Sequence, residues 1–137
     1  MIAMICIDDN GGTMFNHRRQ SKDKVLRAEM LGMLGDKKLK LSPYSAKQFE
    51  AEEQVRLDAA EDFLETAQPG DFCFVEGTPL APYEAKLEQV ILFRWNRTYP
   101  ADTHFDLPLR EHGWTLVESC DFAGSSHEKI TKEIYNK

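Results

Sequence analysis

Two short stretches carry side chains whose types could support ligand binding or catalysis. His17, Arg18 and Arg19 form a compact cation cluster shortly before a predicted helix. Because backbone N–H groups at a helix N-terminus attract anions, this cluster is suited to capturing a phosphate or a carboxylate. The alternative is a solvated loop. Asp23 follows in the first turn of the predicted helix, where a carboxylate also stabilises the helix dipole without any chemical role.

A strand-to-helix junction forms a third candidate. Ser42-Pro43-Tyr44-Ser45 follows a short apolar run and precedes a predicted helix that starts at Ser45. Open α/β sheets usually bind ligands at such junctions, and the helix N-terminus could hold an anion.

The usual enzyme motifs are absent. The sequence contains no phosphate loop, no Gly-x-Gly-x-x-Gly, no Gly-x-Ser-x-Gly elbow and no His-x-x-x-His metal helix. Its four histidines are far apart, and its three cysteines lack a second ligand at zinc spacing. We therefore predict no metal site, and we expect Cys6, Cys73 and Cys120 to be small buried residues in strands.

Composition limits the class of protein. The 137 residues are 42% hydrophobic and 29% charged, which is typical of one globular domain spanning 1–137. A net charge of −6 makes nucleic acid an unfavourable partner. No apolar window approaches the roughly 18 residues of a membrane span, and Met1–Ile7 is too short for a secretory signal. We expect a cytoplasmic protein that does not enter the membrane, with its oligomeric state left open.

The apolar patterns predict the elements that must position these residues. Apolar runs predict strands at 1–7, 39–41, 71–76, 90–95 and 114–122, whereas residues 13–20 show no period and are predicted to form a loop. Helical spacing predicts a helix from an N-cap at Ser21 to Gly35, with Gly32 at a close packing contact, and shorter helices at 59–67 and 83–87. Strands and helices alternate and strands then dominate, which predicts an α/β domain: a mixed, mostly parallel central sheet flanked by helices, with an antiparallel C-terminal part.

The tail, residues 126–136, fits two structures. Ser125 and Glu128 satisfy a helix capping-box pattern, and Ile130 and Ile134 lie on one helical stripe. The same two isoleucines also share one face of a strand. Local rules slightly favour the helix.

Several segments resemble dihydrofolate reductases. The stretch 102–105 (DTHF) and the later segment 113–119 (GWTLVES) are similar to that family's Asp-Thr-x-Phe stretch and the Trp-containing strand after it. VILFRWN is similar to the strand before that stretch, DFCFVEG to the strand that carries a Gly-Gly turn, and MIAMICIDDNGG to the first strand and the start of the substrate loop. The element order matches across nearly the whole chain, which implies a dihydrofolate reductase-like fold and a strand at the tail.

The resemblance also assigns roles. Asp23 lies at the position of the family's proton-handling carboxylate, which faces a pterin, and Ser45 at the position of a hydroxyl residue that touches cofactor phosphate. Glu76 and Gly77 replace the Gly-Gly turn beside the dinucleotide pyrophosphate, so Glu76 adds a negative charge there. Phe93 replaces a Thr that hydrogen-bonds the catalytic carboxylate.

Other departures weaken the case for a cofactor. Pro43 replaces the basic residue that reads a 2′-phosphate, and residues 18–20 (RRQ) replace a Leu-Pro-Trp. Residues 49–71 are short by about one strand and its connection, in the region of the adenosine pocket. We expect no dinucleotide cofactor bound in the family's usual way.

Three functions follow. The first is a small-ligand-binding or regulatory protein whose pocket lies near Asp23, Phe93 and the loop of His17, Arg18 and Arg19, and takes a small anionic or heterocyclic molecule. The alternative is an NAD(P)H-dependent reductase of a pterin-like or other small heterocycle, with NADPH as cofactor and Asp23 as polar anchor or proton donor. The third is an RNA-processing nuclease, because Arg18 and Arg19 form a cation cluster and the GSSHEKITKE segment resembles the end of small proteins that carry the name ribonuclease Z. That enzyme needs a His-x-His-x-Asp-His metal cluster, which this sequence lacks.

Overall fold

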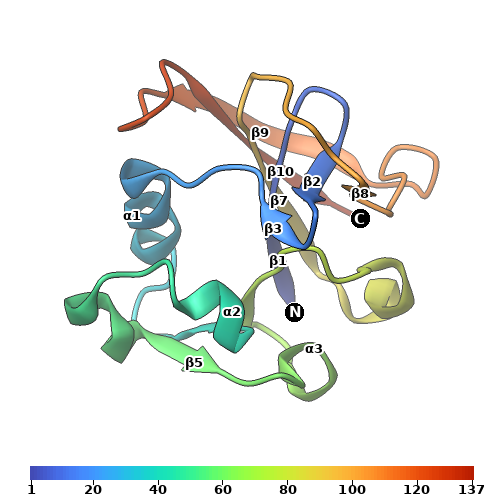
Figure 1. Cartoon of the computed structure of the whole chain (residues 1–137). Helices are drawn as coiled ribbons and strands as arrows, with labels where there is room; N and C mark the ends of the chain where they lie inside the picture. The colour runs from blue at the N-terminus through green and yellow to red at the C-terminus, as the bar shows by residue number, and fades with distance from the viewer.

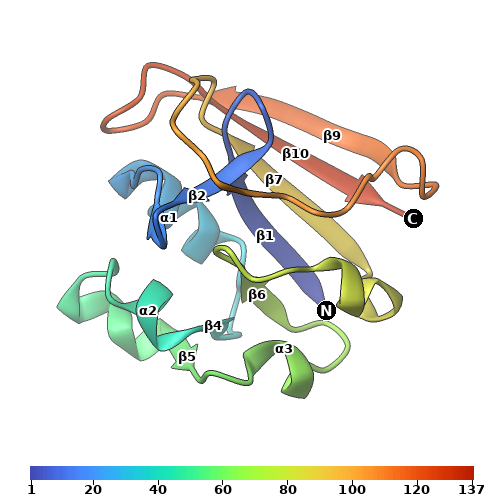
Figure 2. The same ribbon diagram turned by 45° about the vertical axis from the view of Figure 1, so that its right-hand side comes forward.

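Seven strands form the main sheet of the computed structural model, which describes all residues from 1 to 137. Across the sheet the strands are β5 (Leu57–Ala59), β4 (Leu39–Leu41), β6 (Phe72–Phe74), β1 (Ile2–Ile7), β7 (Gln89–Arg94), β10 (Ile130–Asn136) and β9 (Thr115–Phe122) (Figure 1, Figure 2). The five strands from β5 to β7 are parallel, whereas β10 runs antiparallel to both β7 and β9. The predicted mostly parallel sheet with an antiparallel C-terminal part is confirmed.

The strand β1 is apolar along its whole length, and β7 is apolar between Gln89 and Arg94 at its ends, because both faces of the sheet are covered. Along β1, Ala3, Ile5 and Ile7 face one core cluster together with α3 (Phe63–Thr66). Met4, between them, faces the other cluster together with α1 (Lys24–Gly32). This alternation places the two cores on opposite faces of one sheet.

A second, three-stranded sheet stands against the main sheet. Its order is β3 (Arg18–Arg19), β2 (Gly12–Phe15) and β8 (Thr103–His104). A two-residue turn, Asn16-His17, joins β2 to β3, and both residues have positive φ, 52° and 62°. Such mirror-image turns match the twist of a hairpin. The predicted loop at 13–20 is therefore wrong, because strands this short leave no visible alternation.

The helices are short. Besides α1 and α3, the chain forms α2 (Pro43–Ala46) and two 3-10 helices, η1 (Ala51–Arg56) and η2 (Ala81–Lys86). The helix α1 begins at Lys24, and its N-cap is Asp23 rather than the predicted Ser21. A Cβ at Gly32 would meet no atom within 4 Å, so the close contact predicted there is also absent.

The tail forms the strand β10, so the helix that local rules favoured is wrong. Ile134 pairs with Ile91 of β7 and with Glu118 of β9. Hydrogen bonds and packing on both edges outweigh a local capping signal. Residues 50–70, where the sequence suggested a missing strand, still supply β5 at one edge of the sheet.

The cysteines differ in their surroundings. Cys73 is buried in β6, as predicted, and Cys6 is half-buried in β1. Cys120 is exposed, which contradicts the prediction, because β9 is the edge strand of the sheet and seven of its eight residues are exposed. None of the helices has the length and apolar character needed to cross a membrane.

Candidate functional site

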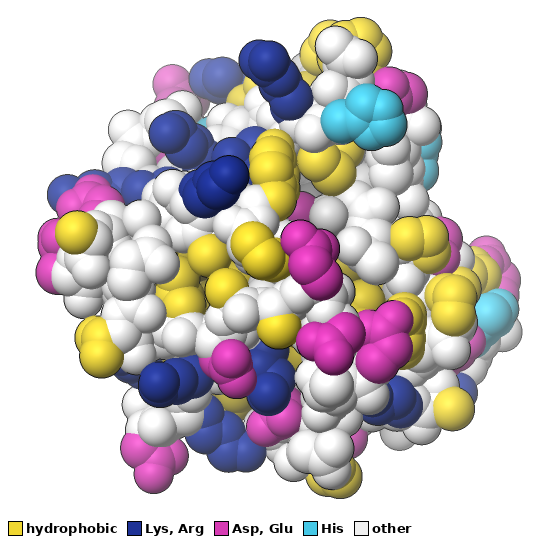
Figure 3. Space-filling model, turned by 60° about the horizontal axis from the view of Figure 1, so that its bottom comes forward, with side chains coloured by type: hydrophobic (Ala, Val, Ile, Leu, Met, Phe, Trp, Pro, Cys, Tyr) yellow, Lys and Arg dark blue, Asp and Glu magenta, His cyan; other side chains and the backbone are white.

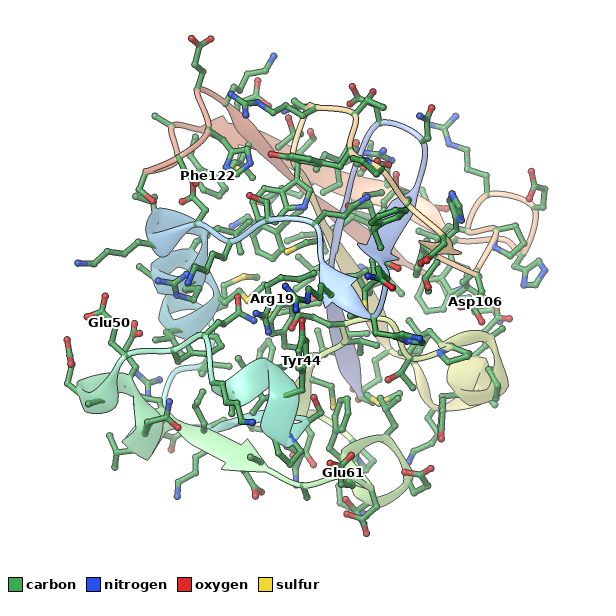
Figure 4. The ribbon with its side chains drawn as sticks, viewed as in Figure 1. Arg19, Tyr44, Glu50, Glu61, Asp106 and Phe122 are labelled. Carbon is green, nitrogen blue, oxygen red and sulfur yellow. The ribbon has the colours of Figure 1, made fainter.

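Two adjoining hollows lie beside the β2–β3 hairpin and share Arg18 and Arg19; together we call them the hairpin groove. The larger has a volume of about 490 Å³ and is lined by Arg18, Arg19, Ser21, Lys22, Tyr44 and Ser126. The other, of about 430 Å³, is lined by Phe15, Asn16, Arg18, Arg19, Gln20, Tyr99 and Pro100. The groove therefore joins the hairpin to α2 and to the loop before β10 (Figure 4).

The cations of the groove are unequally partnered. Arg18 and Lys22 are exposed and form no ion pair, although the chain carries a net charge of −6. Arg19, in contrast, pairs with Glu76. Figure 3 shows Lys and Arg side chains gathered over the upper part of one face, beside exposed apolar side chains. Two unpaired cations at one hollow favour an anionic ligand.

Arg19 extends from β3 across the groove toward α2 (Figure 4). Its Nε donates to Glu76 Oε2 at 3.1 Å, and its guanidinium carbon lies 4.4 Å from the centroid of the Tyr44 ring. The Glu76 carboxylate also accepts a hydrogen bond of 3.1 Å from Gln48 Nε2. The predicted cation cluster thus divides: Arg18 is free, whereas Arg19 is held.

Asp23 lies behind the groove rather than in its wall. Its side chain is buried, and each carboxylate oxygen has three polar groups within hydrogen-bond distance, although the Ser126 hydroxyl also lies 2.9 Å from the Lys22 carbonyl. Oδ1 accepts from the backbone N–H groups of Val25, Leu26 and Ser125 at 2.9–3.1 Å. Oδ2 accepts from the backbone N–H and the Oγ of Ser126, and it pairs with His127 Nδ1 at 3.1 Å. The N-terminus of α1 is therefore capped by its own aspartate.

The surroundings of Asp23 keep it ionised. Burial alone would raise the pKa of this carboxyl, but hydrogen bonds from Ser125, Ser126 and His127 outweigh burial and hold the pKa well below its usual range. His127 is itself buried, stacks on Trp95 with centroids 4.4 Å apart, and pairs through Nε2 with the hydroxyl of Tyr99 at 2.9 Å. We call Asp23 and its donors in the 125–127 loop the Asp23 cluster.

The other residues singled out in the sequence are dispersed. Ser45 is buried, with its hydroxyl 3.2 Å from that of Ser42, the N-cap of α2. Phe93 lies near the C-terminal end of β7 with no exposed surface and contacts Phe122 edge to face. His17 is exposed in the hairpin turn, so only Arg18 and Arg19 of the predicted cluster line the groove.

The Glu76–Gly77 turn is enclosed. Glu76 faces Arg19, and Gly77, with φ of 75°, lies so close to Met14 that a Cβ there would collide with the Met14 sulfur. A carboxylate beside a turn that is already filled does not fit a pyrophosphate. No three His, Cys, Asp or Glu side chains come together in an arrangement that could hold a metal ion.

Sequence reasoning missed most of the groove lining. Lys22 could have been found, since it extends the cation cluster by three residues, and Tyr44 lies within the strand-to-helix junction at 42–45. Ser126 and Tyr99 could not, because each is about 80 residues or more away from the hairpin in sequence and gives no local signal.

Comparison with known proteins identifies the fold. No protein-family model matches the sequence, and no curated protein matches it. Among solved structures, dihydrofolate reductase from Enterococcus faecalis, complexed with NADP(H) and RAB-propyl, superposes with a TM-score of 0.66. The match covers 98% of this chain and 94% of that chain at 12% sequence identity. The chain therefore has a divergent dihydrofolate reductase-like fold.

Proposed function

We propose that this protein binds a small anionic ligand in the hairpin groove, as a binding or regulatory protein built on a dihydrofolate reductase-like fold. One observation supports this most: Arg18 and Lys22 face the same hollow without any acidic partner. Two unpaired cations a few residues apart repel each other, and an anion between them relieves that repulsion.

The chemistry of the lining defines the ligand class. Arg18 offers a planar fork of N–H donors and Lys22 a compact ammonium, both of which bind phosphate or carboxylate oxygens. The hydroxyl of Ser21 also lines the hollow. The exposed ring of Phe15, in the adjoining hollow, can stack on a planar group of the same ligand. A small anion with an aromatic or heterocyclic part uses all of these contacts.

The experiment is a thermal-shift titration with inorganic phosphate and citrate, followed by nucleotides, folates, NADH and NADPH. An anion present at about ten times its Kd stabilises the folded protein by about 1.4 kcal/mol. The double variant Arg18→Ala/Lys22→Ala should lose this stabilisation. The matched control, Lys38→Ala/Arg110→Ala, removes two exposed cations elsewhere and should keep it. Equal responses from the two variants would refute the proposal.

The alternative is an NAD(P)H-dependent reductase, which the NADP(H) complex of the structural neighbour favours. Against it, Glu76 and Met14 fill the turn that resembles the family's pyrophosphate site. A reductase would show NADPH-dependent turnover of dihydrofolate or a related heterocycle, reduced at least about tenfold in Asp23→Asn. The anion-binding proposal expects no stabilisation by NADPH beyond that given by an equally charged nucleotide.

A further inference from the structure

The Arg19 side chain occupies a site that other residues form around it. Its Nε lies 3.1 Å from Glu76 Oε2, and its Nη2 lies 3.3 Å from Glu76 Oε1. Nη2 also donates to the backbone carbonyl of Tyr44 at 3.3 Å, and the guanidinium lies over the Tyr44 ring. A planar cation thus contacts a carboxylate with two of its nitrogens and an aromatic ring with its face.

The acceptor in this site, the Glu76 carboxylate, is buried and held by a second hydrogen-bond donor. The Glu76 side chain is only 9% exposed, and Gln48 Nε2 donates to its Oε1 at 3.1 Å. A carboxylate this deeply buried requires a cationic or hydrogen-bonding partner, since leaving it alone would cost several kcal/mol. The site therefore favours any planar cation that reaches it.

Arg19 and Glu76 also line a small chamber next to this site. Its volume is about 10 Å³, close to the minimum for a single water molecule. Cys6, Val75 and Trp95 line its apolar side, and Thr13, Gln20 and Ser21 its polar side. Gln20 Oε1 is buried and lacks a hydrogen-bond donor. Burial, and then the charge of Glu76, raise the pKa of the Cys6 thiol, so the chamber's thiol stays neutral.

Arg19 is attached to a small part of the fold. It lies on the two-residue strand β3, which pairs only with β2 of the small sheet. The Arg19 side chain is itself 20% exposed, on the groove side. Rotating it out of the site breaks no pairing of the main sheet, and its charge would then lie in water.

We infer that Glu76 and Tyr44 form a binding site for a planar amidinium or guanidinium cation, which Arg19 fills in the free protein. An amidinium presents the same parallel pair of N–H donors to a carboxylate as a guanidinium does. Its planar face stacks on Tyr44 in place of the Arg19 guanidinium. This site goes beyond the proposed function, since it takes a cation and uses neither Arg18 nor Lys22.

The test removes the Arg19 guanidinium by substitution and adds a small planar cation that can take its place. Arg19→Ala is titrated with benzamidinium and with methylguanidinium by calorimetry, with Arg19→Met as a second variant that keeps the packing of the side-chain stem. Benzamidinium should bind either variant at least about tenfold more tightly than it binds the wild type, a difference of about 1.4 kcal/mol. The matched control is Arg110→Ala, which removes an exposed guanidinium outside the groove and should behave as the wild type.

The carboxylate provides the second arm. Combining either variant with Glu76→Gln should abolish amidinium binding, since the charged acceptor is lost. No binding by either Arg19 variant, or binding that survives Glu76→Gln, would overturn the inference. Inorganic phosphate serves as a separate probe of Arg18 and Lys22, so failure here and failure of the proposed anion site give different results.

Discussion

The Asp23 cluster and the hairpin groove lie next to each other and share Ser126, yet they treat charge in opposite ways. Both carboxylate oxygens of Asp23 are held by hydrogen-bonding groups of the chain, four of which are backbone N–H groups. Arg18 and Lys22 in the groove have no charged partner. A charge whose partners are all supplied by the fold stabilises the fold, whereas a charge left without partners is available to a ligand.

The comparison also shows that the position of a residue in the fold does not by itself reveal its role. Asp23 occupies the place that the resemblance gives to a proton-handling carboxylate, and its six contacts all come from the chain itself. Asp8 repeats this pattern: it is buried and accepts from the backbone N–H groups of Asn10, Gly12 and Tyr99. Saturation by internal donors, rather than position, separates a supporting carboxylate from one that faces a ligand.

The largest expected effect comes from disrupting the hydrogen bonds of the Asp23 cluster. In Asp23→Asn, whichever oxygen position receives the amide NH2 group then faces at least one backbone N–H donor in place of an acceptor, three at Oδ1 and one at Oδ2. We expect the free energy of unfolding to fall by about 3 kcal/mol, measured by urea denaturation. The control, Asp36→Asn, changes an exposed aspartate and should leave stability within about 0.5 kcal/mol.

This variant also tests the comparison itself. If Asp23→Asn keeps wild-type stability but loses ligand binding or turnover, then Asp23 belongs to the functional site and the division between the two regions is wrong. Phosphate binding at Arg18 and Lys22, measured at a temperature where the variant is folded, should persist.

The next effect is a loss of stability in acid. The pKa values of both Asp8 and Asp23 are lowered in the folded protein, in each case because backbone hydrogen bonds outweigh burial. The stability that a lowered pKa contributes is complete above the unfolded value of about 3.9 and disappears as the pH falls through the folded value. We therefore expect unfolding free energy to decline from about pH 5 downward, by about 1.4 kcal/mol for each unit of pKa shift.

Comparing variants isolates the contribution of Asp23 to that decline. Asparagine does not titrate, so the stability difference between the wild type and Asp23→Asn should narrow as the pH falls from about 5 to about 2. A difference that stays constant over this range would mean that Asp23 carries no lowered pKa. Urea denaturation at closely spaced pH values provides the measurement.

How well the sequence predicts each region depends on how far apart in the sequence its interacting residues lie. The long apolar runs of β1 and β7 predicted the centre of the sheet, because a strand covered on both faces has to be apolar throughout. The clustering of cationic residues in the sequence indicated that Arg18 and Arg19 belong to the binding site. The tail was misjudged because Ile130 and Ile134 satisfy both periods, and only pairing with β7 and β9 decides between them.

The partners of Asp23 and Arg19 illustrate the same limit. Ser125 and Ser126 lie 102 and 103 residues from Asp23, and Glu76 lies 57 residues from Arg19. No local pattern links residues at such separations, so the sequence could identify these charges but not which of them the fold would neutralise. Element boundaries failed for a related reason, since Asp23 rather than Ser21 caps α1 once the 125–127 loop also holds its carboxylate.

The smallest expected effect concerns the hairpin groove, and it tests the comparison with the Asp23 cluster most sharply. Arg18→Ala and Lys22→Ala remove charges that contribute no internal ion pair, so each should change the free energy of unfolding by less than about 0.5 kcal/mol. Arg94→Ala is the contrasting variant: Arg94 Nε contacts Glu133 Oε1 at 2.6 Å, and its loss should cost about 1 kcal/mol.

The measurement is urea denaturation without phosphate, at low and at high salt. Because like charges at Arg18, Arg19 and Lys22 repel, added salt should stabilise the wild type more than the double variant Arg18→Ala/Lys22→Ala. A cost as large as that of Arg94→Ala would mean that the groove cations support the fold as Asp23 does, and the distinction between the two regions would fail.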